Sequence, residues 1–423
     1  MKKIIVLSMI ICQLVLSCSS DDSSNNLDEL SSDINALLAV PYSKLSPSEQ
    51  KVKLENEANS MLLQMENSKS LTAEESIENM ENLLNISPPE FQMANSGNGF
   101  RDLLNISGVY GIYTWNATQQ IWVKTSSSTE LKFKFPSNQN TTSNDAVLTV
   151  TSVASNIKVD VIDTEEMGYW EYNSVTYQND YVITDPAIYD QIYLPSSVNA
   201  VLTINGTLSG KYEANAVYSN GNPEPTEAGY KLTLDGYVWE NRAKRTTPIS
   251  VKSSFSYGGK NLIDFNVGST ADIDKLIEGS ELTQYLGKAN CLITLMDNFV
   301  IVADMNVEGL ANDSEDLNKI PEPDYNNPTT VSAYNKTISE GEVSAFNKNV
   351  KMAFVSKKDG TKLADVVLRS VKGEIYYDYQ EEYDANLFLK FGDGSEVAMD
   401  VYFSSGFDNL TTRFQDFINS FNQ

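Results

Sequence analysis

The hydrophobic pattern changes its period along the chain. Within residues 54–65 and 77–84, apolar residues recur every three or four positions, the spacing of one face of an α-helix. Pro47 stands where a helix can start, and the sequence TAEE at 72–75 has the form of a capping box. We therefore predict a helical segment over 27–90.

Two arrangements fit this N-terminal segment. A helical hairpin packed on the main body is favoured, because each periodic run is short and short helices depend on tertiary packing for stability. The alternative is a coiled-coil surface for a partner protein.

From about residue 109 the period becomes two, the period of a β-strand with one buried face. In the sequence LKFKF, Leu131, Phe133 and Phe135 alternate with lysines. Similar alternations occur in 202–208 and 230–238. Strands with one polar face are typical of antiparallel sheets, so we expect the rest of the chain to form such sheets.

Three turn sequences join pairs of alternating runs, each with a glycine at its second position. They are Gly258-Gly259, Asp359-Gly360 and Asp393-Gly394, which are typical of tight β-hairpins. The sequences that contain them, GGKNLIDF, DGTKLADV and DGSEVAMDV, resemble one another. This similarity favours two related sheet units.

A helical pattern follows the first and the third of these hairpins, at 271–286 and 407–421. The polar face of the second pattern carries two aspartates and a single arginine, which favours a helix that caps a sheet over one that binds a membrane. Its apolar stripe is formed by Phe407, Leu410, Phe414, Phe417, Ile418 and Phe421.

The N-terminus carries the pattern of an export signal. Lys2 and Lys3 precede an apolar run from Ile4 to Leu16. The run has the length of a secretory leader and is shorter than the roughly 20 residues that cross a bilayer as a helix. We therefore predict that the leader is removed during export.

The leader ends in the sequence VLSC at 15–18. This sequence resembles the lipobox of bacterial lipoproteins, and the resemblance implies that Cys18 is acylated and becomes the mature N-terminus. Ser19 then implies sorting to the outer membrane, and the sequence SDD at 20–22 resembles the signal that sends Bacteroidota lipoproteins to the cell surface. The alternative is a plain secretory signal in which Cys18 has no role.

Together these patterns predict an α+β fold, in which N-terminal helices are followed by mainly antiparallel β-sheet units, each capped by a helix. An exposed loop is expected at 312–328, where acidic residues, asparagines and prolines cluster. The expected segments are a signal peptide at 1–17, a lipidated tether at 18–26, the helical segment at 27–90, and sheet-plus-helix units at 109–286 and 287–423.

The chain is strongly acidic. It has 423 residues, of which 57 are Asp or Glu and 31 are Lys or Arg, for a net charge of −26. Loss of the leader removes two lysines and no acidic residue, which makes the charge −28. This charge argues against a nucleic-acid partner and against a polybasic grip on lipid headgroups. The membrane contact that remains is the lipid anchor.

The inventory of reactive side chains is short. The chain has no histidine, which excludes Ser-His-Asp and Cys-His catalysis and ordinary zinc sites. Cys291 is the one cysteine left after loss of Cys12 and acylation of Cys18, and we expect it to be a buried structural thiol. No nucleotide-binding glycine motif occurs. The sequence therefore indicates no catalytic residue, no cofactor and no metal ligand.

The sequence is compatible with catalysis by carboxylates alone. A glycosidase needs only two acids at a fixed separation, and Glu165-Glu166 and Glu381-Glu382 are acid pairs without a recognisable context. A calcium site also stays open, although no EF-hand-like loop sequence is present.

Aromatic residues are the other candidates. The four tryptophans, Trp115, Trp122, Trp170 and Trp239, can provide flat surfaces for sugar rings or can lie in the core. Trp239 shares with Tyr237 the polar side of its expected strand, which indicates an exposed aromatic surface.

The sequence thus favours an outer-membrane, surface-exposed lipoprotein that acts as a non-catalytic binding or structural module. Its partners would be the membrane, through the anchor, and a glycan or an apolar ligand; whether it has a protein partner is unknown from the sequence. One alternative is a carrier of apolar ligands, similar in architecture to the half-barrel of periplasmic lipoprotein carriers. The other is a carboxylate-only glycosidase. A cavity would favour the carrier. Paired acids in a cleft would favour the enzyme, and a filled core with exposed aromatic residues would favour the binding module.

The anchor can be tested by the substitution Cys18→Ser. Because acyl chains give firm membrane attachment, the wild-type protein should enter the detergent phase in detergent-phase partitioning. The variant should fold and enter the aqueous phase. A variant that still partitions into detergent would contradict the assignment of Cys18.

Overall fold

The computed structural model shows a mostly β protein, and the predicted combination of helices and sheets is confirmed at that level. By its internal contacts the chain forms two compact units, one up to Leu71 and from Gly236 on, the other Thr72–Asp235. We describe each unit by itself. The structure describes residues 27–67, 71–87, 110–128, 130–162, 168–173, 178–183, 188–219, 221–270, 287–373 and 381–404.

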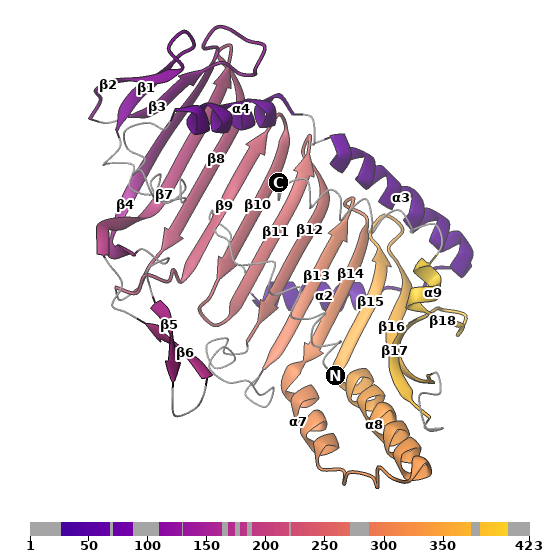
Figure 1. Ribbon diagram of the computed structural model, residues 1–423. Coiled ribbons are helices and arrows are strands. Elements are labelled where there is room, and N and C mark those ends of the chain that lie inside the picture. The colour runs from indigo at the N-terminus through magenta and orange to yellow at the C-terminus, as the bar shows by residue number, and fades with distance from the viewer. Residues whose placement is uncertain are drawn as a thin grey trace. The chain divides into compact units, whose positions relative to one another are not determined.

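The sheet of the first unit is an antiparallel meander, in which strands adjacent in the chain are adjacent in the sheet (Figure 1). Its strands are β10 (Tyr237–Lys244), β11 (Ile249–Tyr257), β12 (Lys260–Ser269), β13 (Lys288–Leu295), β14 (Phe299–Asn306), β15 (Val350–Ser356), β16 (Thr361–Lys372), β17 (Tyr383–Lys390) and β18 (Glu396–Ala398). Its helices are α2 (Leu27–Leu38), α3 (Pro47–Asn67), α7 (Val307–Asn318), α8 (Pro328–Asn349) and α9 (Met399–Phe403).

The three predicted hairpin turns are confirmed. They join β11 to β12, β15 to β16 and β17 to β18. Gly258 and Gly259 have φ angles of 56° and 79°, which residues with a Cβ rarely adopt. The glycines are therefore required by the turns, which explains why these turns could be found in the sequence.

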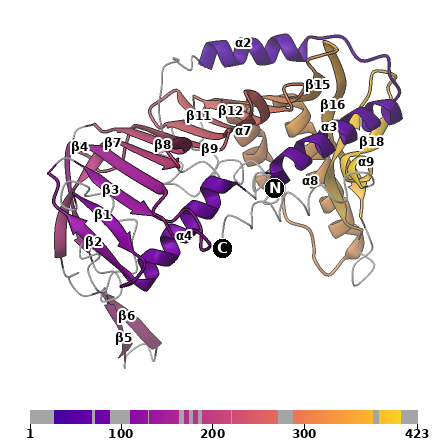
Figure 2. The ribbon, with the colours of Figure 1, turned by 90° about the horizontal axis from the view of Figure 1, so that it is seen from above.

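Helices α2 and α3 cover opposite faces of this sheet (Figure 2). On one face, Leu30 and Ile34 of α2 pack against Val300 and Val302 of β14. On the other face, Leu54 of α3 belongs to a cluster in which β14, β15, β16, β17 and α9 also take part. Alternate residues of β14 thus belong to different apolar clusters, so both faces of the strand are covered by apolar side chains.

The predicted loop at 312–328 is wrong in its first half, because α7 continues to Asn318. The side chain of Asn306 caps this helix by accepting a hydrogen bond from the Gly309 backbone N–H at 3.1 Å. Helix α8 then begins at Pro328 and was not predicted. Its buried side includes Ser339 and Asn349, so its apolar period is weak.

The second unit contains a mixed sheet with the strand order β2-β1-β3-β4-β7-β8-β9. Strands β1 and β3 are parallel, which departs from an antiparallel sheet. Strands β5 and β6 form a separate antiparallel pair. The elements are α4 (Thr72–Ile86), β1 (Gly111–Asn116), β2 (Ile121–Thr125), β3 (Leu131–Phe135), β4 (Ala146–Ile162), β5 (Gly168–Asn173), β6 (Gln178–Ile183), β7 (Ile188–Ile204), β8 (Thr207–Val217) and β9 (Glu227–Leu234).

The alternation in LKFKF is confirmed, since Leu131, Phe133 and Phe135 are buried and the lysines between them are not. The run 202–208, however, is not one strand. Asn205 and Gly206 form a turn between β7 and β8, with φ angles of 53° and 77°. An Asn-Gly pair is a strong hairpin signal, so this turn could have been recognised in the sequence.

The unit boundaries differ from those expected at 109–286 and 287–423. The reason is hydrogen bonding, because β12 and β13 pair along their length and no boundary falls between them. The segment 27–90 is also divided between the two units, and its helices α2 and α3 pack on the sheet of the first unit. The signal peptide, Cys18, the tether at 18–26 and the helical patterns at 271–286 and 407–421 lie outside the described residues.

The packing of α2 can be tested with Ile34→Ala. Ile34 is fully buried against the sheet, so truncation should lower the free energy of unfolding by about 2–5 kcal/mol. Leu63→Ala is the control, because Leu63 lies exposed on α3 and should change stability by under about 0.5 kcal/mol. Denaturant unfolding of the protein without its lipid gives both values. Equal effects would contradict the covering role of α2.

Candidate functional site

The four tryptophans have different surroundings. Trp115 and Trp122 are buried in the second unit, where their rings meet edge to face with centroids 5.4 Å apart. They belong to the core. Trp170 is 69% exposed. Trp239 is half-buried on β10. Among the tryptophans, therefore, Trp170 best fits a role in contact with a ligand.

The aromatic surface expected at Tyr237 and Trp239 is mostly covered. Tyr237 and Tyr257 stack at 4.2 Å between ring centroids, and Trp239 and Phe255 at 4.8 Å, as cross-strand pairs of β10 and β11. The Tyr237 hydroxyl donates a hydrogen bond to the Gln64 carbonyl of α3 at 2.9 Å. The prediction was thus wrong for Tyr237, because α3 shields that end of the row.

Burial and the neighbouring Tyr257 both raise the pKa of Tyr237. Tyr257, the cross-strand partner of Tyr237, is 41% exposed. The row is consequently a structural feature in which Tyr257 is the exposed ring.

The β5–β6 hairpin carries the exposed aromatic surface of the second unit. Trp170 and Tyr172 lie two residues apart on β5 and therefore on the same face of the hairpin. Tyr172 is 59% exposed, and Glu171 between them is exposed on the other face. In register, Trp170 pairs with Tyr181 and Glu171 with Asp180. Figure 1 shows this hairpin beyond the ends of β4 and β7. We call Trp170 and Tyr172 the β5 aromatic surface.

A lysine and a tyrosine of the same unit already form a cation–aromatic contact. The Lys158 ammonium lies 5.9 Å from the centroid of the Tyr193 ring. The two residues are partners in the register of β4 and β7, and Tyr193 is largely exposed. An exposed tyrosine ring of this unit thus makes a cation–aromatic contact with an ammonium group.

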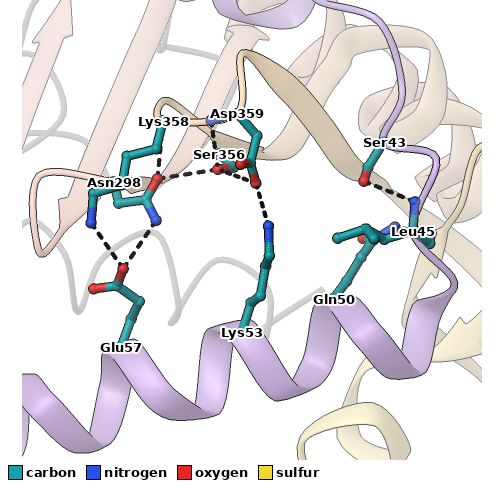
Figure 3. Close-up of polar contacts among 9 residues, drawn as sticks. All are labelled: Ser43, Leu45, Gln50, Lys53, Glu57, Asn298, Ser356, Lys358 and Asp359. Carbon is teal, nitrogen blue, oxygen red and sulfur yellow. Dashed lines mark hydrogen bonds and ion pairs between the residues drawn. The ribbon is translucent and has the colours of Figure 1, made fainter.

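A cluster of polar side chains lies in the first unit, where α3 meets two β-turns (Figure 3). It consists of Lys53 and Glu57 from α3, Asn298 from the β13–β14 turn, Ser356 at the end of β15, and Lys358 and Asp359 from the β15–β16 turn. We call it the turn clamp.

Asn298 holds the centre of the turn clamp. Its side-chain N–H donates to Glu57 Oε1 at 3.2 Å, and its Oδ1 accepts from the Ser356 hydroxyl and the Lys358 backbone N–H, each at 3.1 Å. Its backbone carbonyl accepts from the Lys357 N–H at 2.8 Å. One buried side chain therefore ties both turns to each other and to α3.

Two ion pairs complete the turn clamp. Lys53 Nζ lies 2.9 Å from Asp359 Oδ2, and Lys358 Nζ lies 3.0 Å from Glu57 Oε1. Hydrogen bonds from Lys53 and from Ser356 lower the pKa of Asp359. The two positive and two negative charges cancel, and Ser356 is fully buried. This arrangement suits structural support.

The start of α3 is held next to the turn clamp. The fully buried Gln50 donates from Nε2 to the Leu45 carbonyl at 2.9 Å, and the Leu45 N–H donates to Ser43 Oγ at 3.2 Å (Figure 3). These bonds fix the segment that enters the helix.

A tyrosine–aspartate contact lies nearby in the same unit. The Tyr42 hydroxyl donates to Asp365, whose other oxygen is 3.0 Å from Lys362 Nζ. The Lys362 ammonium also lies 4.8 Å from the centroid of the Tyr42 ring. Burial, followed by the bond to Asp365, raises the pKa of Tyr42 to about 12. The phenol is thus held in its neutral form.

The candidate acid pairs show no catalytic arrangement within the described residues. Glu381 lies 2.6 Å from Lys372 Nζ and also accepts from the Tyr383 hydroxyl, and the lysine bond lowers the pKa of Glu381. Glu165-Glu166 lies outside the described residues. The described part of the chain brings no three Cys, Asp or Glu side chains together as a metal site.

The structure bears on two further expectations from the sequence. Cys291 is buried on β13, as predicted. None of the helices in the described ranges combines the length and the apolar character needed to cross a bilayer.

The turn clamp was not predicted from the sequence, because its residues are scattered over three sequence regions. Only the Asp359-Gly360 turn gave a local signal.

The centre of the turn clamp can be tested with Asn298→Ala. The change leaves buried partners of Asn298 without hydrogen bonds, so the free energy of unfolding should fall by about 1–3 kcal/mol. Glu57→Gln is the control, because it retains a hydrogen-bond acceptor and removes one ion pair, at a cost of under about 1 kcal/mol. Denaturant unfolding measures both, and a smaller effect for Asn298→Ala than for Glu57→Gln would refute the central role of Asn298.

The ion pair of Asp359 predicts a pH dependence. Because its pKa is lowered in the folded protein, the pair stabilises the fold above the unfolded pKa of about 3.9. The contribution is lost as the pH falls below that value through the lowered pKa. The wild-type protein should therefore melt at a higher temperature than Asp359→Asn at pH 7, and the difference should shrink below about pH 4. A difference that stays constant would contradict this assignment.

The chain matches no family model, no curated protein and no solved structure.

Proposed function

We propose that this protein is an outer-membrane, surface-exposed lipoprotein, anchored through Cys18, that acts as a non-catalytic binding module. The observation that carries the proposal is the β5 aromatic surface, where Trp170 and Tyr172 are 69% and 59% exposed on one face of a hairpin. Large aromatic side chains are costly to leave in water, and they are the residues that most often carry binding energy at interfaces.

The charged residues support a binding role over an enzymatic one. The lysines and acids of the turn clamp are engaged with one another, and Glu381 and Glu396 are each held by a basic residue. Binding through aromatic faces needs no acidic or basic side chain, so a chain without histidine can provide it. A glycan is the first ligand class for such a surface, since sugar rings stack on aromatic rings.

The apolar clusters favour the binding module over the carrier. Each of the three clusters in the first unit consists of side chains from a sheet and a helix in mutual contact. The proposal retains the α+β interpretation, in which the helical patterns at 271–286 and 407–421 also cover sheet surface.

The proposal predicts that binding depends on the β5 aromatic surface. The protein is titrated with a soluble neutral polysaccharide, a lysine-rich peptide and a fatty acid, and the probe that binds is used further. Trp170→Ala/Tyr172→Ala should weaken its binding at least about tenfold, because aromatic anchors dominate such contacts. Isothermal titration calorimetry measures the affinities.

Tyr325→Ala is the matched control, because Tyr325 is an equally exposed tyrosine of the first unit. Its affinity should equal that of the wild-type protein. Binding that survives in the double variant, or the absence of binding to all three probes, would refute the proposal.

A further inference from the structure

Strand β2 is the outermost strand of the sheet in the second unit (Figures 1 and 2). Within the described ranges, β2 pairs along its length with β1, and no backbone hydrogen bond reaches its second edge. That edge therefore presents a row of unpaired backbone N–H and C=O groups, which is the feature that another β-strand recognises.

The edge of β2 lacks the features that usually protect sheet edges from such pairing. Protected edges are very short or carry proline, bulges or charged side chains. Strand β2 has no proline, and its register with β1 is regular. Its single charged residue, Lys124, is turned towards β1, where its ammonium lies 5.4 Å from the centroid of the Tyr113 ring. By contrast, the outermost strand of the first unit, β18, has three residues, and its Glu396 is ion-paired with Arg369.

The side chains beside this edge are apolar and exposed. Ile121 and Val123 lie on the face of β2 opposite to the buried Trp122, and they are 42% and 44% exposed. Both are β-branched, and residues of this kind stabilise cross-strand pairs. A strand that pairs with β2 would cover part of both side chains.

The local charge favours a second copy of this chain as the source of that strand. Positions 110–128 contain one lysine and no acidic residue, although the chain as a whole carries a net charge of −26. Two acidic copies repel each other least where neither contributes an acidic side chain. The edge of β2 meets this condition.

The sequence of β2 also fits antiparallel pairing with itself. A two-fold axis at Val123 places the Val123 side chains of the two copies opposite each other. It also places Ile121 opposite Thr125. Lys124 then lies opposite Trp122 and not opposite Lys124 of the second copy, so no like charges meet. Because each copy uses its β2 edge once, the pairing closes at a dimer.

We infer that β2 is the dimerisation edge of this protein and that two copies pair antiparallel through it. The inference goes beyond the proposed function and does not use the β5 aromatic surface, so either can fail while the other stands. A contact of one five-residue strand from each copy is smaller than a standard interface, so the dimer should be weak in solution. Copies anchored to one membrane would meet at a higher effective concentration, where a weak contact is sufficient.

Sedimentation equilibrium tests the inference on the chain without its leader and with Cys18→Ser, so that neither lipid nor micelles contribute to association. With β2 unchanged, this protein should show a reversible monomer–dimer equilibrium between about 5 and 500 μM. A rise from about 50 to 300 mM salt should strengthen the dimer at least about threefold, because salt screens the repulsion between two acidic copies.

A matched pair of variants tests the contact at the edge. Val123→Lys should weaken the dimer at least about fivefold, because it places two ammonium groups opposite each other. Val153→Lys is the control, since Val153 is 60% exposed on β4, a strand with a neighbour on each side. The control makes the same change of charge in the same unit and should leave the dimer unchanged.

Disulfide formation tests the register. In Val123→Cys the two thiols lie opposite each other within reach of a disulfide, so mild oxidation should link the dimer. In Thr125→Cys the two positions lie about 14 Å apart along the strands and should not link. A mixture of Ile121→Cys and Thr125→Cys proteins should link. The native Cys291 is buried, and the protein with β2 unchanged gives its background.

The results that would overturn the inference differ for each part. A monomer at every concentration in both salts, or a dimer that Val123→Lys leaves unchanged, would refute the contact at β2. Equal linking of Val123→Cys and Thr125→Cys would refute the antiparallel register. Oligomers that continue to grow beyond the dimer would refute the closed pairing of two copies.

Discussion

The first unit depends on keeping both faces of one sheet out of water. In a meander each strand has two faces, and in β14 the side chains of both faces are apolar: Phe299 and Ile301 point one way, Val300 and Val302 the other. A sheet of this kind is stable only if something apolar covers each side. Helices α2 and α3, from the start of the chain, provide the two covers.

This constraint explains the position of the turn clamp. Helix α3 must be held over one face, and its amphipathic character alone does not fix where along the sheet it lies. The bonds from Lys53 and Glu57 to the two turns set that position, with Asn298 as the common partner. At the far end of the helix, the bond from Tyr237 to the Gln64 carbonyl adds a second attachment. The turn clamp thus serves the packing of α3 on the sheet.

The sequence predicted the elements with strong local signals and missed those that depend on tertiary contacts. Alternation identified β3, and glycines with positive φ identified three hairpins. Helix α8 was missed, because its buried side includes Ser339 and Asn349, whose polar groups bond to protein partners. The same limit applies to the candidate site. Tyr237 is covered by a helix from a distant part of the chain, whereas Trp170 is 69% exposed. The sequences of the two strands indicate neither difference.

The central claim is that ligand contact occurs at the β5–β6 hairpin and not at the turn clamp or the aromatic row of β10 and β11. Hydrogen–deuterium exchange of the intact protein, with and without the probe that it binds, tests it directly. We expect slower exchange of backbone amides in 168–173 and 178–183 when the probe is bound, with 296–298 and 356–360 unchanged. Slower exchange confined to 237–257 or to the turns around Asn298, with the hairpin unchanged, would contradict it.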